Sequence, residues 1–115
     1  MTTEGGAVAS GYALTVRFTL RDTDAAARFD ALAAHTLEGI RREPGTVVYV
    51  VHQPVDEPLV RVFYELYADE AAFQAHEAQP HTKSFLEERG QYLANTEVAF
   101  LHEVVGKRPD AAGRP

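Results

Sequence analysis

The side chains best suited to chemistry in this chain are two histidines in its C-terminal half. His76 lies three positions after Phe73, and His81 lies four positions before Phe85, so on helices each histidine shares the inward face of an aromatic residue. Imidazoles titrate near neutral pH, so two of them beside one pocket can act as general base and general acid. The alternative is that each is a partly buried histidine with a structural hydrogen bond.

A carboxylate, Glu65, falls on a strand face that is otherwise largely apolar. It shares the alternation of Leu59, Phe63 and Tyr67, and Arg61 lies two residues earlier on the same face. Burial raises the pKa of a carboxyl group and would bring Glu65 towards useful basicity. The competing interpretation is a structural Arg61–Glu65 ion pair, or a bond from Glu65 to a partner chain.

Aromatic residues supply the candidate walls of a pocket. Tyr49 and Tyr67 offer phenols and flat faces, while Phe63 and Phe73 would form apolar walls. His35 lies off the apolar stripe of its predicted helix, which is a position typical of the solvent-facing flank.

A metal site is an alternative for the same histidines. Histidine pairs on one helix bind metal from positions four apart, whereas His76 and His81 are five apart with Pro80 between them. Together with Glu65 they match the residue types of a two-histidine, one-carboxylate iron site. We expect no metal ion, and the sequence contains neither a nucleophile elbow nor a glycine-rich phosphate loop.

Composition limits the class of protein. The 115 residues suffice for one domain, and 17 acidic against 11 basic side chains make a nucleic-acid partner unexpected. The absence of cysteine excludes disulfides and thiolate chemistry. No apolar run is long enough to cross a bilayer, and the N-terminus lacks the pattern of a secretion signal. We therefore expect a small soluble cytoplasmic protein without a membrane partner.

Period-two and helical patterns predict the elements that position these residues. Strands are expected over residues 12–20, 46–53, 59–67 and 98–104. A helix capped by Asp22 or Thr23 should run to about residue 42, where Glu43-Pro44-Gly45 stops it. A short helix over 70–78, capped by Asp69, precedes a helical stretch that begins at residue 80 and ends at 95–96.

The predicted order β-α-β-β-α-β is that of an α+β, ferredoxin-like domain over residues 11–105, with flexible tails at 1–10 and 106–115. Right-handed crossovers place both helical segments on one face of the sheet. The other face of the strands at 46–53 and 59–67 is also apolar, and a bare apolar face needs a cover. We therefore predict a homodimer that packs through the open sheet face.

Several motifs resemble the antibiotic biosynthesis monooxygenase family. They are Glu43-Pro44-Gly45, the strand residues 49–52, the stretch 63–73 with its Tyr-Glu-Leu-Tyr end, and the two histidines that flank Gln79-Pro80. The resemblance runs from residue 14 to 104 and implies a dimeric α+β barrel with a pocket between sheet and helices. It also places Tyr67 where much of the family carries a pocket tryptophan, and His35 at the pocket rim.

The family includes cofactor-independent oxygenases of polyketide phenols, quinol monooxygenases, an isomerase of a phosphorylated sugar and haem-degrading relatives. The resemblance implies a cofactor-independent monooxygenase that uses dioxygen on a small hydroxyaromatic or quinol. His76 or His81 would be the base, and Tyr67 and Arg61 would stabilise charge. The alternatives are an isomerase of a sugar-derived hydroxyketone, in which a histidine and Glu65 shuttle a proton, and a dimeric ligand-binding protein without catalysis.

Overall fold

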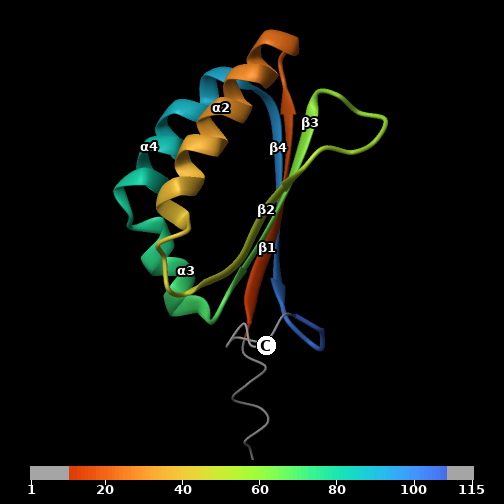
Figure 1. Cartoon of the computed structure of the whole chain (residues 1–115). Helices are drawn as coiled ribbons and strands as arrows, with labels where there is room; N and C mark the ends of the chain where they lie inside the picture. The colour runs from red at the N-terminus through yellow and green to blue at the C-terminus, as the bar shows by residue number, and fades with distance from the viewer. Residues whose placement is uncertain (1–10, 109–115) are drawn as a thin grey trace, which may run out of the picture.

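A computed structural model describes residues 11–108 as one antiparallel sheet with helices on a single face (Figure 1). No helix within this range is long and apolar enough to cross a membrane. The strands are β1 (Tyr12–Leu20), β2 (Thr46–His52), β3 (Val60–Tyr67) and β4 (Leu93–His102). The helices are α2 (Thr23–Ile40), α3 (Glu70–Glu77) and α4 (Pro80–Arg89), followed by the 3-10 turn η1 (Gly90–Tyr92).

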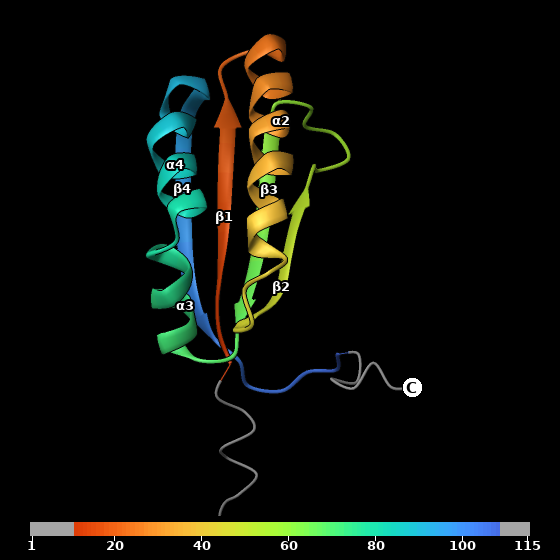
Figure 2. The ribbon, with the colours of Figure 1, turned by 60° about the vertical axis from the view of Figure 1, so that its left-hand side comes forward.

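The sheet has the strand order β2-β3-β1-β4, so β1 and β3 are central and the other two strands form the edges. β1 pairs antiparallel with both β3 and β4, which places Phe63 opposite Val16 and Phe100 opposite Leu14. Figure 2 shows α2 lying over β3, and α3 and α4 lying over the β4 side. The predicted ferredoxin-like α+β fold is therefore confirmed.

Local signals in the sequence explain where the helices begin. The Asp22 carboxylate accepts a hydrogen bond from the Ala25 amide at 2.8 Å, and Asp69 accepts one from the Ala72 amide at the same distance. Both predicted caps are confirmed. Beyond the end of α2, the Glu-Pro-Gly turn comes so close to α3 that a Cβ on Gly45 would lie 2.5 Å from Ala72 Cβ. This close approach brings Glu43 next to the second helical segment.

The prediction for the last helix was wrong at its end. The sequence pattern extends that helix through Leu93, but α4 stops at Arg89 and β4 begins at Leu93. Leu93 pairs with Leu20 of β1, so strand pairing over the whole length of β1 prevails over the local helical pattern. At its other end β4 stops at His102 rather than at residue 104.

An aromatic cluster forms the core between sheet and helices. Phe18, Phe29 and Phe63 pack with ring centroids 5.0 to 5.8 Å apart, and Phe85 of α4 joins them at 5.8 to 6.0 Å. Burial of one such ring stabilises a fold by about 2 to 3 kcal/mol. The cluster thus fixes α2 and α4 on the sheet and forms the floor of the cavity described below.

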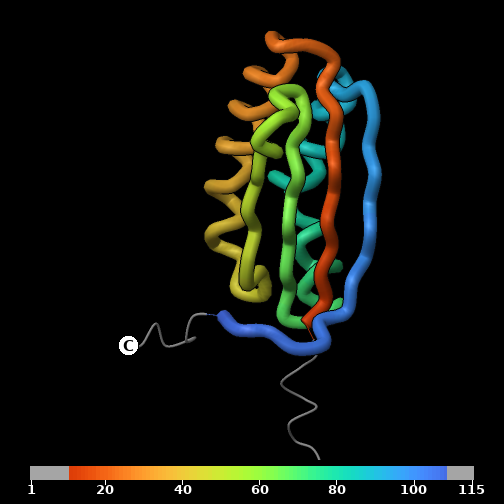
Figure 3. Tube along the Cα trace, turned by 90° about the vertical axis from the view of Figure 1, so that its right-hand side faces the viewer, coloured from red at the N-terminus to blue at the C-terminus, as the bar shows by residue number. Residues whose placement is uncertain are grey.

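Within residues 11–108, the opposite face of the sheet carries no helix, and residues 103–108 cross its lower end (Figure 3). Those residues line a pocket together with Val48, Tyr64 and Leu66 of this face, and Val50, which pairs with Tyr64, is 42% exposed. The apolar open face expected from the sequence is therefore present in the single chain. Residues 1–10 and 109–115, expected to belong to tails, lie outside the described residues.

Candidate active site

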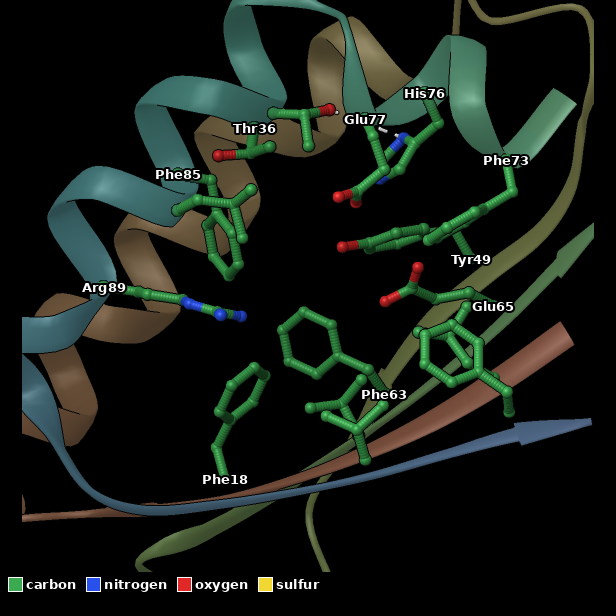
Figure 4. A pocket seen from close by; sticks show the side chains of 16 residues that line it. Phe18, Thr36, Tyr49, Phe63, Glu65, Phe73, His76, Glu77, Phe85 and Arg89 are labelled. Atoms are coloured by element: carbon green, nitrogen blue, oxygen red, sulfur yellow. Dashed lines mark hydrogen bonds between the residues drawn. The ribbon is translucent and has the colours of Figure 1, made fainter. Parts of the chain in front are cut away.

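A cavity of about 160 Å³ lies between the sheet and the helices, and we call it the inner cavity (Figure 4). Its walls are largely apolar, with six phenylalanine and tyrosine rings, and they come from all four strands and from α2, α3 and α4. On the β4 side, Val98 and Phe100 line it but remain 51% and 56% exposed, so the cavity is open there. The polar groups that reach it include Glu65, His76 and Arg89.

His76, on α3, is held between a carboxylate and two tyrosine rings. Its Nδ1 lies 2.8 Å from Oε1 and 3.1 Å from Oε2 of Glu43, and its ring lies 5.7 Å from that of Tyr49 and 5.2 Å from that of Tyr67. The side chain is 4% exposed and lines the inner cavity. Because Nδ1 is engaged by Glu43, Nε2 is the ring nitrogen left for a ligand.

Glu43 gathers three hydrogen-bonding side chains around one buried carboxyl group. Thr46 Oγ1 donates to its Oε1 at 2.6 Å, His76 binds through Nδ1, and His81 binds Oε2 through Nε2. Burial by itself would raise the pKa of Glu43, but the hydrogen bonds from Thr46, His81 and His76 outweigh it and lower the pKa. Glu43 is therefore an ionised carboxylate at neutral pH.

His81 reaches Glu43 from a second, larger concavity of about 880 Å³, which we call the outer groove. The Glu-Pro-Gly turn, α3 and the start of α4 line this groove, and His76 and Glu43 border it as well. The His81 ring packs on Gly39 of α2, where a Cβ would overlap the imidazole. Of these three residues, Glu43 and His81 line only the outer groove, whereas His76 lines both the outer groove and the inner cavity.

Glu65 faces the inner cavity and is 6% exposed. Tyr67 donates its hydroxyl hydrogen to Oε1 of Glu65 at 2.7 Å. Burial raises the pKa of Glu65 to about 7, and the charges of Glu77 and Glu43 add to it, while the Tyr67 hydrogen bond and Arg89 act against it. At neutral pH this carboxyl group is therefore poised to take up or release a proton.

Arg89 points from α4 into the inner cavity, on the side opposite Tyr49 and Glu65 (Figure 4). Its guanidinium carbon lies 5.3 Å from the ring centre of Phe18, a cation–π distance. Within residues 11–108 it forms no ion pair. Burial lowers its pKa, and the negative charges of Glu77 and Glu65 oppose that effect. The guanidinium of Arg89 could therefore bind an anionic oxygen of a ligand in the inner cavity.

The structure brings most of the predicted site residues together. Glu65, His76, Tyr49, Phe63 and Phe73 all line the inner cavity, and their predicted roles there remain predictions.

Two further candidates lie beside the cavity rather than in its wall. Tyr67 is completely buried behind Glu65, and burial followed by the Glu65 charge raises the pKa of its phenol. His81 faces the outer groove. His35 is exposed on α2 and lines neither the inner cavity nor the outer groove.

The expected Arg61–Glu65 pair is not formed. Arg61 instead donates to both carboxylate oxygens of Asp30 on α2, at 2.8 and 2.9 Å, and to the carbonyl oxygens of Pro58 and Val60. The long arginine side chain reaches the Asp30 carboxylate on α2, and the carbonyl oxygens of Pro58 and Val60, before and at the start of β3, accept its remaining hydrogen bonds. Arg61 is therefore a buried structural residue outside the inner cavity.

Sequence reasoning missed Glu43 and Arg89 as site residues. Arg89 lies four positions after Phe85, so the helical spacing that marked Phe85 as inward would also have marked Arg89. Glu43 carries no such signal, because its partners His76 and His81 lie 33 and 38 positions further along the chain. Among residues 11–108, no group of three or more acidic or histidine side chains is arranged to hold a metal ion.

The fold and the cavity together define a class of protein: a small ferredoxin-like α+β domain with a cavity between its sheet and its helices. The sequence profile of the family described as antibiotic biosynthesis monooxygenase matches residues 12–88, and the chain belongs to this family. A search of curated proteins found no match.

Solved structures support the fold. Rv0793 from Mycobacterium tuberculosis is 25% identical, with a TM-score of 0.79 over 86% of this chain and 100% of its own. SnoaB from Streptomyces nogalater, described as a cofactor-independent oxygenase, is 24% identical, with a TM-score of 0.73 over 89% and 100%. A conserved protein from Methanosarcina mazei is 18% identical, with a TM-score of 0.79 over 88% and 100%.

Proposed function

We propose that the protein is a cofactor-independent monooxygenase of a small hydroxyaromatic or quinol, with His76 as the base. The observation that carries this proposal is His76 in the wall of an aromatic cavity, with Nδ1 bound to Glu43 and Nε2 left for a ligand. Arg89 across the cavity would stabilise the anion that proton removal creates. Similarity to the oxygenase SnoaB supports the reaction class.

The reaction requires from the protein a base, a positively charged group that stabilises the substrate anion, and a cavity that excludes water. Transfer of the substrate O–H proton to His76 leaves an electron-rich anion that passes one electron to dioxygen. The superoxide then combines with the ring radical, and a C–O bond forms. Protonation of this peroxide and loss of the ring C–H proton break the O–O bond, release water and leave a quinone that keeps one oxygen atom.

The size of the inner cavity limits the substrate. About 160 Å³ compares with the roughly 150 Å³ of an apolar cavity that holds a benzene ring. One aromatic ring therefore fits inside, and a fused second ring would extend past Val98 and Phe100 at the open side. Single-ring hydroquinones and small naphthoquinols are therefore the substrates that the size of the cavity favours.

Oxygen uptake by the purified protein tests the proposal. A panel of hydroquinones, naphthoquinols and anthrols is offered to the wild type, to His76→Ala and to His52→Gln, the last being an exposed histidine at the end of β2. We expect uptake above the autoxidation rate, lost by about 10² to 10⁴-fold in His76→Ala and kept in His52→Gln. Uptake no faster than with boiled protein, or equal in His76→Ala, would contradict the proposal.

A second candidate function is a proton-shuttling isomerase of a small hydroxyketone. It is favoured by Glu65, whose pKa of about 7 lets it exchange protons beside His76 in the same cavity. Anaerobic incubation with dihydroxyacetone in D₂O would then replace the hydrogen next to the carbonyl, and Glu65→Gln would abolish this exchange. If neither oxygen uptake nor hydrogen exchange occurs, the results favour the remaining alternative, a ligand-binding protein without catalysis.

We also propose that the protein forms a homodimer through its open sheet face. Val50 and Leu101 on this face are 42% and 39% exposed, and no helix covers it within residues 11–108. Light scattering should give about twice the chain mass of 12.7 kDa. Val62→Asp, in the centre of the face, should dissociate the dimer, and a wild-type monomer would contradict this proposal.

A further inference from the structure

We propose that the carboxylate of Glu43 holds the two histidines in opposite tautomers, His76 with its proton on Nδ1 and His81 with its proton on Nε2. Glu43 is thereby the positioning residue that turns the lone pair of His76 Nε2 towards the inner cavity. The functional part of this inference rests on the proposed role of His76 as the base. The structural part stands on the contacts alone.

Three contacts around one carboxyl group carry the inference. Nδ1 of His76 lies 2.8 Å from Oε1 of Glu43, Nε2 of His81 binds Oε2, and Thr46 donates its hydroxyl hydrogen to Oε1 at 2.6 Å. An ionised carboxylate only accepts hydrogen bonds, so each nitrogen that faces it must carry a hydrogen. A neutral imidazole has one such hydrogen, which leaves the other nitrogen with a lone pair.

The charge on Glu43 makes this assignment firm. Its three hydrogen bonds outweigh the effect of burial and lower the pKa of the carboxyl group, so Glu43 stays ionised at neutral pH. Thr82 Oγ1 lies 3.5 Å from Nδ1 of His76, at the edge of hydrogen-bonding distance, and does not compete with the shorter Glu43 contact. The carboxylate is therefore the dominant partner of Nδ1.

The two histidines meet Glu43 through different nitrogens because they approach from different sides. His76, on α3, lines both the inner cavity and the outer groove, whereas His81, on α4, lines only the outer groove. The His81 ring is fixed on its other side by Gly39 of α2, whose missing Cβ leaves room for the imidazole. His81 thus holds the carboxylate from outside, while His76 presents Nε2 to the cavity.

Long-range ¹H–¹⁵N spectra of the imidazoles test the inference without any substrate. The ¹⁵N shifts show directly which nitrogen carries the hydrogen. We expect the wild type to show His76 with Nδ1–H and His81 with Nε2–H, each as a single tautomer. In Glu43→Gln, whose neutral amide both donates and accepts, His76 should become a mixture of tautomers. The control is Glu38→Gln, an exposed position on α2, which should leave both histidines unchanged.

Kinetics separate positioning from a purely structural role. With a hydroquinone that the wild type oxidises, Glu43→Gln should lower kcat by about 10 to 10⁴-fold and change KM little, because binding persists while the base loses its orientation. Glu38→Gln should keep both constants. If Glu43→Gln does not fold, Glu43→Asp withdraws the carboxylate by one methylene and serves instead.

Failure of the inference and failure of the proposed function give different results. A wild-type spectrum with His76 protonated on Nε2, or Glu43→Gln with an unchanged tautomer, overturns the inference whatever the activity. Opposite tautomers in a protein that oxidises no member of the panel overturn only the proposed function and leave the inference confirmed.

Discussion

Replacing Glu65 by glutamine will make the stability of the protein less dependent on pH between about pH 4.5 and pH 7. The buried carboxyl group has its pKa raised from 4.5 to about 7 in the folded protein, chiefly by burial. A raised folded-state pKa gives stability that is complete below the unfolded-state pKa and is lost as the pH rises through about 7. Glutamine has nearly the same shape and its carbonyl oxygen still accepts the Tyr67 hydroxyl hydrogen, but it never ionises.

The expected size of the effect follows from the two pKa values. One pKa unit corresponds to about 1.4 kcal/mol, so ionising Glu65 in the folded protein costs about 3 kcal/mol more than ionising it in the unfolded chain. Glu43 does not disturb this window, because its pKa is lowered and its contribution is lost only as the pH falls below 4.5. The difference between Glu65→Gln and wild type should therefore grow by about 3 kcal/mol from acid to alkaline pH, of which about 2.5 kcal/mol falls between pH 5 and pH 8.

Urea unfolding followed by circular dichroism, near pH 5 and near pH 8 at one protein concentration, measures this difference. Glu87→Gln, which removes the same charge at an exposed position of α4, is the control for the general effect of charge. A gain in stability for Glu65→Gln that is equal at both pH values would refute the reasoning. Glu65 would then be solvated in the folded protein rather than buried.

Two further substitutions test how the site is held. Gly39→Ala should destabilise the protein by about 1 to 3 kcal/mol, because the alanine Cβ overlaps the His81 ring, and this outweighs the helix preference of alanine of about 1 kcal/mol. Urea unfolding measures the change, and Gly90→Ala, whose new Cβ has no atom within 4 Å, is the control. Equal changes in stability for the two variants would contradict the packing of His81 on Gly39. Asp30→Ala leaves the buried guanidinium of Arg61 with two carbonyl partners and should cost about 1 to 3 kcal/mol in the same assay. Unchanged stability would show that Asp30 contributes little to holding Arg61.

The fold was predictable because its signals are local. The alternation of Tyr12 to Leu20 identified β1, the carboxylates of Asp22 and Asp69 marked the beginnings of two helices, and the Glu-Pro-Gly turn marked the end of one. Each of these signals acts over a few residues. The end of α4 was mispredicted, since Leu93 is recruited by pairing with Leu20, which lies 73 positions earlier.

Side-chain partners were harder to predict than elements. Strand alternation correctly placed Glu65 on the helix-covered face, and helical spacing correctly placed His76 inward. Alternation also placed Arg61 on that face, but it does not indicate how far the long arginine side chain extends or which group it reaches. The arginine extends to Asp30 on α2, and the hydroxyl of Tyr67 takes the place beside Glu65.

The sequence alone determined the strand and helix order, the faces on which Glu65 and His76 lie and the family to which the chain belongs. Only the tertiary structure decided that Glu43 joins His76 and His81, and that burial raises the pKa of Glu65 to about 7. The physical reason is that periodicity reports which side of an element a residue occupies. A hydrogen-bond partner and the loss of solvent depend on distances between elements, and these are set only when the helices pack on the sheet.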